Sequence, residues 1–295
     1  PPTGTAPALA AAVGFPRPAA AIGLVFATLS AWSGSLLVFL ERRALVRMRL
    51  GRALSGGALA IGFAALIGAE AIVPITDLAQ HQNAIVFSGH SERGRYGVTA
   101  GQAALELFVE GRLTLTSVDG RRYHEALVHP AMLSAARRER VLVLGAGHGA
   151  VAREVLRHAE LRELVLVVPD AKLVELSRRL AWLSQLSERS LESPKLRVVE
   201  REAVVWLGEA SEMFDVVIVD VPDPGSYVDA KNYSLHFYEV LSARLSPGGV
   251  AVVQATSPFG SPLTFASVVA TLRASGLETR AYRAPVPTFG DWGFV

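Results

Sequence analysis

The chain has 295 residues, which is enough for one full α/β domain with smaller attachments. Its formal net charge is +2, and the positive excess lies in one short segment near the N-terminus, so no basic face for nucleic acid is expected. The chain contains no cysteine, which excludes a disulfide framework, a thiolate zinc site and a cysteine nucleophile.

Two uncharged apolar runs near the N-terminus have the length of membrane spans. Residues 19–40 contain no charged side chain, and a helix of that length crosses a hydrocarbon core of roughly 30 Å. A buried core helix is the alternative, but a second uncharged run over residues 53–69 disfavours it. We therefore predict an N-terminal tail over residues 1–18 and a two-helix transmembrane hairpin over residues 19–76.

The connection between the two runs carries five arginines, so we expect it to lie in the cytoplasm. This orientation predicts an integral membrane protein with two spans, the lipid bilayer as a partner, and a soluble domain on the outer or periplasmic side. Small residues recur at every fourth position of both runs, which lets helices approach closely. They serve either the packing of the hairpin itself or docking to transmembrane helices of other subunits.

The rest of the chain changes its pattern once. Residues 82–124 contain short alternating runs, such as LELFVEG and RLTLTSV, which predict a small antiparallel β unit. From residue 125 to residue 295, apolar strands alternate with helices, which predicts a Rossmann-like α/β domain with a parallel sheet. The strands are expected at residues 141–145, 164–168, 196–200, 214–220 and 248–256, and helices at residues 151–159, 173–186 and 237–245.

Two motifs follow strands of this predicted sheet. GAGHGA, residues 145–150, is a glycine-rich turn of the kind that places backbone N–H groups and a helix N-terminus under a ligand. DVPDP, residues 220–224, places two carboxylates where ligands bind in open α/β sheets. One carboxylate can accept a proton while the other pairs with a cation. Aspartates that only cap turns are the alternative interpretation.

The ordered series YHEALVHP, GAGHGAVAREVL, FDVVIVDVPDP, YSLHFYEVLSARLSPGGVAVVQATSP and PTFGDWGFV resembles the spermidine synthase family of polyamine aminopropyltransferases, especially its membrane-attached bacterial branch. The resemblance covers about residues 95–295. It implies transfer of an aminopropyl group from decarboxylated S-adenosylmethionine, the co-substrate, to a small polyamine, without a metal.

The resemblance also implies roles for individual residues. Asp220 would be the base that deprotonates the attacking amine, Asp223 would hold the amine substrate, and Tyr123 would position the attacking nitrogen. His124 and Glu125 belong to the same motif as Tyr123 and are candidates for substrate binding. The residues predicted to line the donor site are Gly145, Gly147, His148, Gly149, Asp170 and Glu202.

Several donor-side positions depart from the family. The family's glycine loop carries an aspartate that binds the amine of the donor, whereas this chain has His148, which is mostly uncharged at neutral pH. The second strand usually ends in an acid that accepts the ribose hydroxyls. Here Val168 holds that place, and Asp170 follows two residues later. The donor site therefore looks degenerate.

Three functions remain open from the sequence. The first is a membrane-anchored aminopropyltransferase. The second is a catalytically inactive family member that serves as a structural or interaction subunit of a membrane protein complex. The third is a methyltransferase on the same fold, which the DVPDP and YHEALVHP motifs disfavour.

Overall fold

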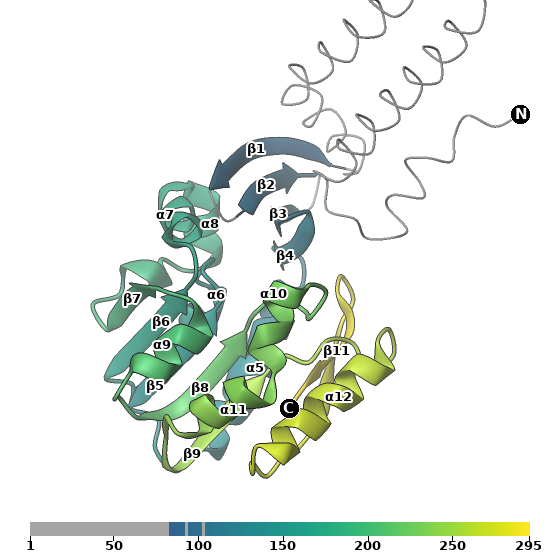
Figure 1. Cartoon of the computed structure of the whole chain (residues 1–295). Helices are drawn as coiled ribbons and strands as arrows, with labels where there is room; N and C mark the ends of the chain where they lie inside the picture. Colours follow the sequence, from purple (N-terminus) through teal and green to yellow (C-terminus); the bar gives the residue numbers. More distant parts are fainter. Residues whose placement is uncertain (1–82, 92–93, 102–103) are drawn as a thin grey trace, which may run out of the picture. The chain divides into compact units, whose positions relative to one another are not determined.

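The computed structural model describes residues 83–91, 94–101 and 104–295 (Figure 1). The predicted tail over residues 1–18 and the predicted hairpin over residues 19–76 lie outside this part. The predicted localisation as an integral membrane protein is corrected. The longest described helix, α5 (Gly120–Ser134), has 15 residues and spans about 22 Å, short of a core of roughly 30 Å. Within the described ranges, no helix has the length and apolarity that a membrane crossing requires.

The first described element is a four-stranded antiparallel sheet in which each strand pairs with the next along the chain. One face of this sheet buries Val98, Leu107 and Leu115 against Leu183, because side chains alternate between the two faces of a strand. The strands are β1 (Ala84–Ser91), β2 (Gly94–Ala100), β3 (Leu105–Val109) and β4 (Arg112–Thr116).

The second sheet is parallel and has the strand order β7-β6-β5-β8-β9. Its three central strands are almost continuously buried, which explains their runs of valine, leucine and isoleucine. The predicted Rossmann-like parallel sheet is thereby confirmed. The strands are β5 (Arg140–Gly145), β6 (Glu163–Val168), β7 (Leu196–Glu200), β8 (Phe214–Asp220) and β9 (Leu245–Val253).

Helices pack on both faces of the parallel sheet (Figure 1). Helices α5 and α6 (Ala150–Leu156) share one core with Val141 and Val143 of β5. The alternate residues Leu142 and Leu144 face a second core, formed with α9, α11 and α12. The remaining helical segments are α7 (Ala171–Arg179), α8 (Ala181–Leu186), η1 (Ser190–Glu192), α9 (Ala203–Glu209), α10 (Tyr227–Ala230), η2 (Lys231–Tyr233), α11 (Leu235–Ser242) and α12 (Pro262–Ala274).

The structure differs from the sequence prediction in three respects. The single helix expected over residues 173–186 is two helices, because Leu180 between α7 and α8 has an extended backbone with ψ of 111°. Both helices contribute side chains to the core under the antiparallel sheet, so tertiary packing overrides the helical period there. The second difference is α12 with the terminal hairpin of β10 (Tyr282–Val286) and β11 (Gly290–Phe294), none of which the prediction contained. The third is that α5, α9 and α10 were not among the predicted helices, and α5 begins within the β unit predicted over residues 82–124.

Leu127 provides a test of the core that α5 forms with the parallel sheet. Its side chain is 0% exposed, whereas Leu133 on the same helix is 68% exposed. We expect Leu127→Ala to lower the free energy of unfolding by about 2–5 kcal/mol through lost burial and the cavity left behind. Leu133→Ala, the matched control, should change it by no more than about 0.5 kcal/mol. Urea denaturation of both variants measures this difference, and equal losses would contradict the packing described.

Candidate active site

The candidate site lies where β5 and β8 end side by side. Gly145 pairs with Asp220 in the parallel ladder, so the glycine loop and the DVPDP segment leave the sheet at the same point. Gly145 has a φ of +90°, and a Cβ there would overlap the Asp220 carbonyl. Only glycine therefore permits this close approach of the two strand ends. Carboxyl ends of neighbouring parallel strands form the usual ligand crevice of such sheets.

Asp220 is the best-defined acid of the site. The Tyr123 hydroxyl donates a hydrogen bond to Asp220 Oδ1 at 2.7 Å. Burial raises the pKa of Asp220 to about 6; the Tyr123 hydrogen bond opposes this rise, and the nearby charge of Asp223 adds to it. Burial and the charge of Asp220 hold the Tyr123 pKa well above its usual value, so its phenol stays a hydrogen-bond donor.

Asp223 lies on the same loop, and its carboxylate is hydrogen-bonded by Gln254, the residue that directly follows β9. The Gln254 amide donates to Asp223 Oδ1 at 3.1 Å and to the Val221 carbonyl at 2.6 Å. Its amide oxygen accepts from Trp292 Nε1 at 3.1 Å, which ties Asp223 to the terminal hairpin. Sequence reasoning did not single out Gln254, although a polar residue at the end of an apolar strand was a usable signal.

The terminal hairpin also surrounds Tyr123. Phe289, Trp292 and Phe294 place their ring centroids between 5.4 and 6.1 Å from the Tyr123 ring. These aromatic contacts restrict the orientation of the phenol. The C-terminal segment therefore supports Tyr123 directly and Asp223 through Gln254.

His148 and His124 lie beside Asp220 and are almost completely buried, at 1% and 0% exposure. His148 Nδ1 accepts a hydrogen bond from the Ala150 N–H at 3.2 Å, and its Nε2 lies 3.9 Å from Asp220 Oδ2. Burial and the charge of Arg153 lower the pKa of His148 to about 4. The two imidazole rings are 5.2 Å apart. His148 is therefore a neutral ring that faces a carboxylate.

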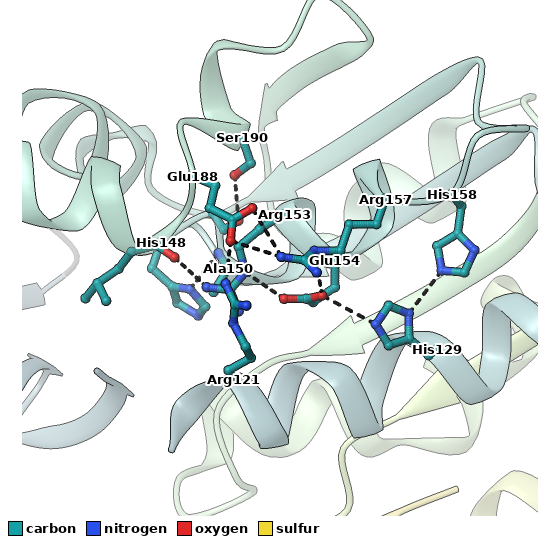
Figure 2. Close-up of polar contacts among 12 residues, drawn as sticks. Arg121, His129, His148, Ala150, Arg153, Glu154, Arg157, His158, Glu188 and Ser190 are labelled. Carbon is teal, nitrogen blue, oxygen red and sulfur yellow. Dashed lines mark hydrogen bonds and ion pairs between the residues drawn. The ribbon is translucent and has the colours of Figure 1, made fainter. Parts of the chain in front are cut away.

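A charged network holds the helix that follows His148 (Figure 2). Arg153 Nε donates to Glu154 Oε1 at 2.6 Å, and Arg153 also donates to the Leu186 carbonyl. Glu154 Oε2 pairs with Arg157 at 3.2 Å and His129 at 3.4 Å. Because the buried charges of α6 are paired, the loop before this helix has a rigid support.

Asp170 follows β6, two strands away from Asp220 in the sheet, and its carboxylate joins neighbouring elements of the fold. Its Oδ1 accepts from the Lys172 N–H at 2.8 Å, which caps α7. Its Oδ2 accepts from the hydroxyls of Tyr96 and Ser91, which joins α7 to the antiparallel sheet. Asp170 also lines a pocket of about 500 Å³ together with Glu200, whose carboxylate accepts from the Ala171 N–H.

The other predicted site residues are placed as follows. Gly147 and Gly149 form the turn before α6, and the Ser190 hydroxyl donates to the Gly149 carbonyl at 2.6 Å. Glu202 is the residue preceding α9, just after β7. Glu125 follows His124 on α5 and is partly buried. The structure thus gathers Tyr123, His124, His148 and Asp220 in one cluster, with Asp223 beside it.

Comparisons with known proteins agree with this arrangement. Residues 120–295 match the family described as the spermine/spermidine synthase domain. Polyamine aminopropyltransferase 1 of Streptomyces coelicolor is 43% identical over 195 residues, which are 66% of this chain and 36% of that protein. A polyamine aminopropyltransferase of Mycobacterium tuberculosis is 37% identical over 288 residues, or 96% of this chain and 54% of that protein. The chain therefore spans about half, or less, of the length of these relatives.

The solved structure of spermidine synthase from Thermotoga maritima is similar, with a TM-score of 0.66 and 25% identity over 71% of each chain. A spermidine synthase in complex with the transition state analogue AdoDATO shares the fold, with a TM-score of 0.67, 24% identity and coverage of 71% of this chain and 72% of that one. The match over residues 120–295 and the identity to these relatives lead to one assignment. This chain belongs to the spermine/spermidine synthase family.

Proposed function

We propose that this protein transfers an aminopropyl group from decarboxylated S-adenosylmethionine to an amine of a small polyamine. The observation that carries the proposal is the Asp220 carboxylate, whose side chain is only 11% exposed, with the Tyr123 phenol on one oxygen and Asp223 on the same loop. Relatives named polyamine aminopropyltransferases support it.

The proposed chemistry assigns Asp220 the proton. An alkylammonium with a pKa of about 10 is protonated at neutral pH and cannot attack carbon. Asp220, which is mostly ionised above pH 6, accepts one proton from the amine. The nitrogen lone pair then forms a bond to the carbon next to the sulfonium, the C–S bond breaks, and sulfur keeps the electron pair. Methylthioadenosine leaves as a neutral thioether.

Asp223 is proposed to hold a second ammonium group of the acceptor. Its carboxylate is partly buried and keeps its orientation through Gln254. Burial raises the pKa of Asp223, while hydrogen bonds from Gln254 and Thr256 lower it. A fixed carboxylate at a distance from the base selects a diamine or longer polyamine over a monoamine, because only a second cation can pair with it.

The donor side is proposed to be altered. The glycine loop of Gly145, Gly147 and Gly149 has the turn that a nucleoside ligand needs, but His148 is neutral and cannot act as an anion toward an ammonium group. On the other side of the crevice, the oxygens of Asp170 already accept hydrogen bonds from the protein. We therefore expect a weaker hold on the aminopropyl donor than a site with two free carboxylates would have.

These donor-side features also favour a second candidate function, an inactive family member that acts as a structural or interaction subunit of a complex. Calorimetric titration with decarboxylated S-adenosylmethionine, with methylthioadenosine as a product-like control, separates the two. Micromolar binding of the donor supports catalysis. A folded protein that binds neither compound and co-purifies with fixed partners supports the second candidate.

Asp220→Asn tests the proposed base. The amide cannot accept the proton, so we expect kcat/KM to fall about 10²- to 10⁴-fold in an assay of aminopropyl transfer. Because burial raises the pKa of Asp220, its ionisation weakens the folded state progressively as pH rises from about 4 through 6. The variant should therefore keep its fold at pH 7. Asp291→Asn, which removes an ion pair with Arg283 on the terminal hairpin, is the control. Equal turnover of both variants would exclude Asp220 as the base.

Tyr123→Phe tests the effect of the phenol on the same carboxylate. The Tyr123 hydrogen bond lowers the pKa of Asp220, so its loss should move the acidic limb of the pH profile of kcat/KM from about 6 to higher pH. Tyr282→Phe removes a hydroxyl that donates to the Ala126 carbonyl and serves as the control. An unchanged acidic limb in Tyr123→Phe would show that the phenol does not tune the base.

A further inference from the structure

Two histidines and one carboxylate converge in the buried centre of the site. His124, His148 and Asp220 each offer one ligand atom, and these atoms all lie within 4.8 Å of one another. His148 Nε2 and Asp220 Oδ2 are 3.9 Å apart, which is longer than a direct hydrogen bond. The three groups therefore surround a point without bonding directly to one another.

The buried ring of His124 is poorly supplied with hydrogen-bond partners. Its ring is completely buried on α5, and apart from a contact with the Gly120 backbone neither ring nitrogen has a hydrogen-bond partner of normal geometry within the described residues. A buried polar group without a partner is unfavourable, and such groups in native proteins usually have a role or a ligand. The ring of His124 faces the ring of His148, so its ring nitrogens belong to the same cluster.

We propose that His124, His148 and Asp220 bind a divalent transition-metal ion of the Zn²⁺ class. Two imidazoles and one carboxylate are a known ligand set for such ions, with an open fourth position. Ligand bonds of about 2.1 Å place tetrahedral ligand atoms about 3.4 Å apart. Atoms that now lie within 4.8 Å reach this spacing when each moves inward by less than about 1 Å, which side-chain rotation supplies.

The surroundings of the three ligands suit a metal. The Tyr123 hydroxyl occupies Asp220 Oδ1 and leaves Oδ2 for the ion. Hydrogen bonds to the second oxygen of a ligating carboxylate are a common outer-shell support of metal sites.

One hydrogen bond opposes the metal. The Ala150 N–H donates to His148 Nδ1, which keeps the ring proton on Nε2. Coordination through Nε2 moves that proton to Nδ1 and removes the acceptor of Ala150. Loss of one buried hydrogen bond weakens binding roughly tenfold to a hundredfold.

A bound ion would occupy the oxygen of Asp220 that faces the glycine loop. Metal binding itself does not depend on aminopropyl transfer. Its effect on turnover rests on the proposed function, because an ion on Oδ2 neutralises the proposed base and inhibits the reaction. His148 stands where the family has an aspartate that binds the donor. The same residue completes the proposed metal site.

Cobalt titration tests the site. The full chain, without a histidine tag and stripped with a chelator, is titrated with Co²⁺ and followed by visible absorption. We expect one ion per chain with the intense bands of low-coordinate Co²⁺, and displacement by Zn²⁺. Only weak bands of six-coordinate Co²⁺, or no binding, would overturn the proposal.

Two variants locate the ion. His148→Gln and His124→Gln should each weaken Co²⁺ binding by about 100-fold or more. His236→Gln, at an exposed position of α11, should leave binding unchanged. Circular dichroism confirms that each variant is folded, and His148→Gln, at a loop position, decides the matter if His124→Gln does not fold. Binding that survives in a folded His148→Gln would place the ion elsewhere. Since the titration contains no donor or acceptor, an inactive enzyme and a missing metal site give different results.

Discussion

The parallel pairing of β5 with β8 is the constraint on which the candidate site depends. It sets Gly145 against Asp220, at a separation that only a residue without a Cβ permits. The glycine loop and the acidic loop therefore leave the sheet together, and His148 is carried to 3.9 Å from the Asp220 carboxylate. Burial of the strand end, with the nearby charge of Asp223, raises the pKa of Asp220 toward the range in which a carboxylate can exchange protons near neutrality.

Residues distant in the sequence complete the site. Tyr123 comes from α5, and its ring is held by the terminal hairpin, whose Trp292 also binds Gln254. Through Gln254, that hairpin reaches Asp223. Each polar contact is partly buried, where a missing partner would cost more than in water. The C-terminal segment therefore supports Asp220 through Tyr123 and Asp223 through Gln254. Its aromatic residues are uncharged and act by positioning these two side chains.

His148 has two consequences that follow from one property. Its ring is neutral because burial and Arg153 disfavour the protonated form. A neutral ring is a poor partner for an ammonium group, which bears on the proposed donor site. It is also a potential metal ligand, and it lies next to the buried ring of His124. The charged network behind α6 keeps the loop rigid and so fixes this ring relative to Asp220 (Figure 2).

The sequence by itself determined the parallel α/β class, the turn of GAGHGA and the position of the DVPDP acids, because hydrophobic period and glycine placement are local properties. It did not determine the break at Leu180, the terminal hairpin, or the partners of Asp170, because these depend on contacts between distant segments. Two apolar runs were sufficient to suggest membrane spans, but these runs lie outside the described residues. Among the described residues, no helix is long and apolar enough for that role. Only the tertiary structure placed His124 beside His148, since strand register and helix packing decide which side chains meet.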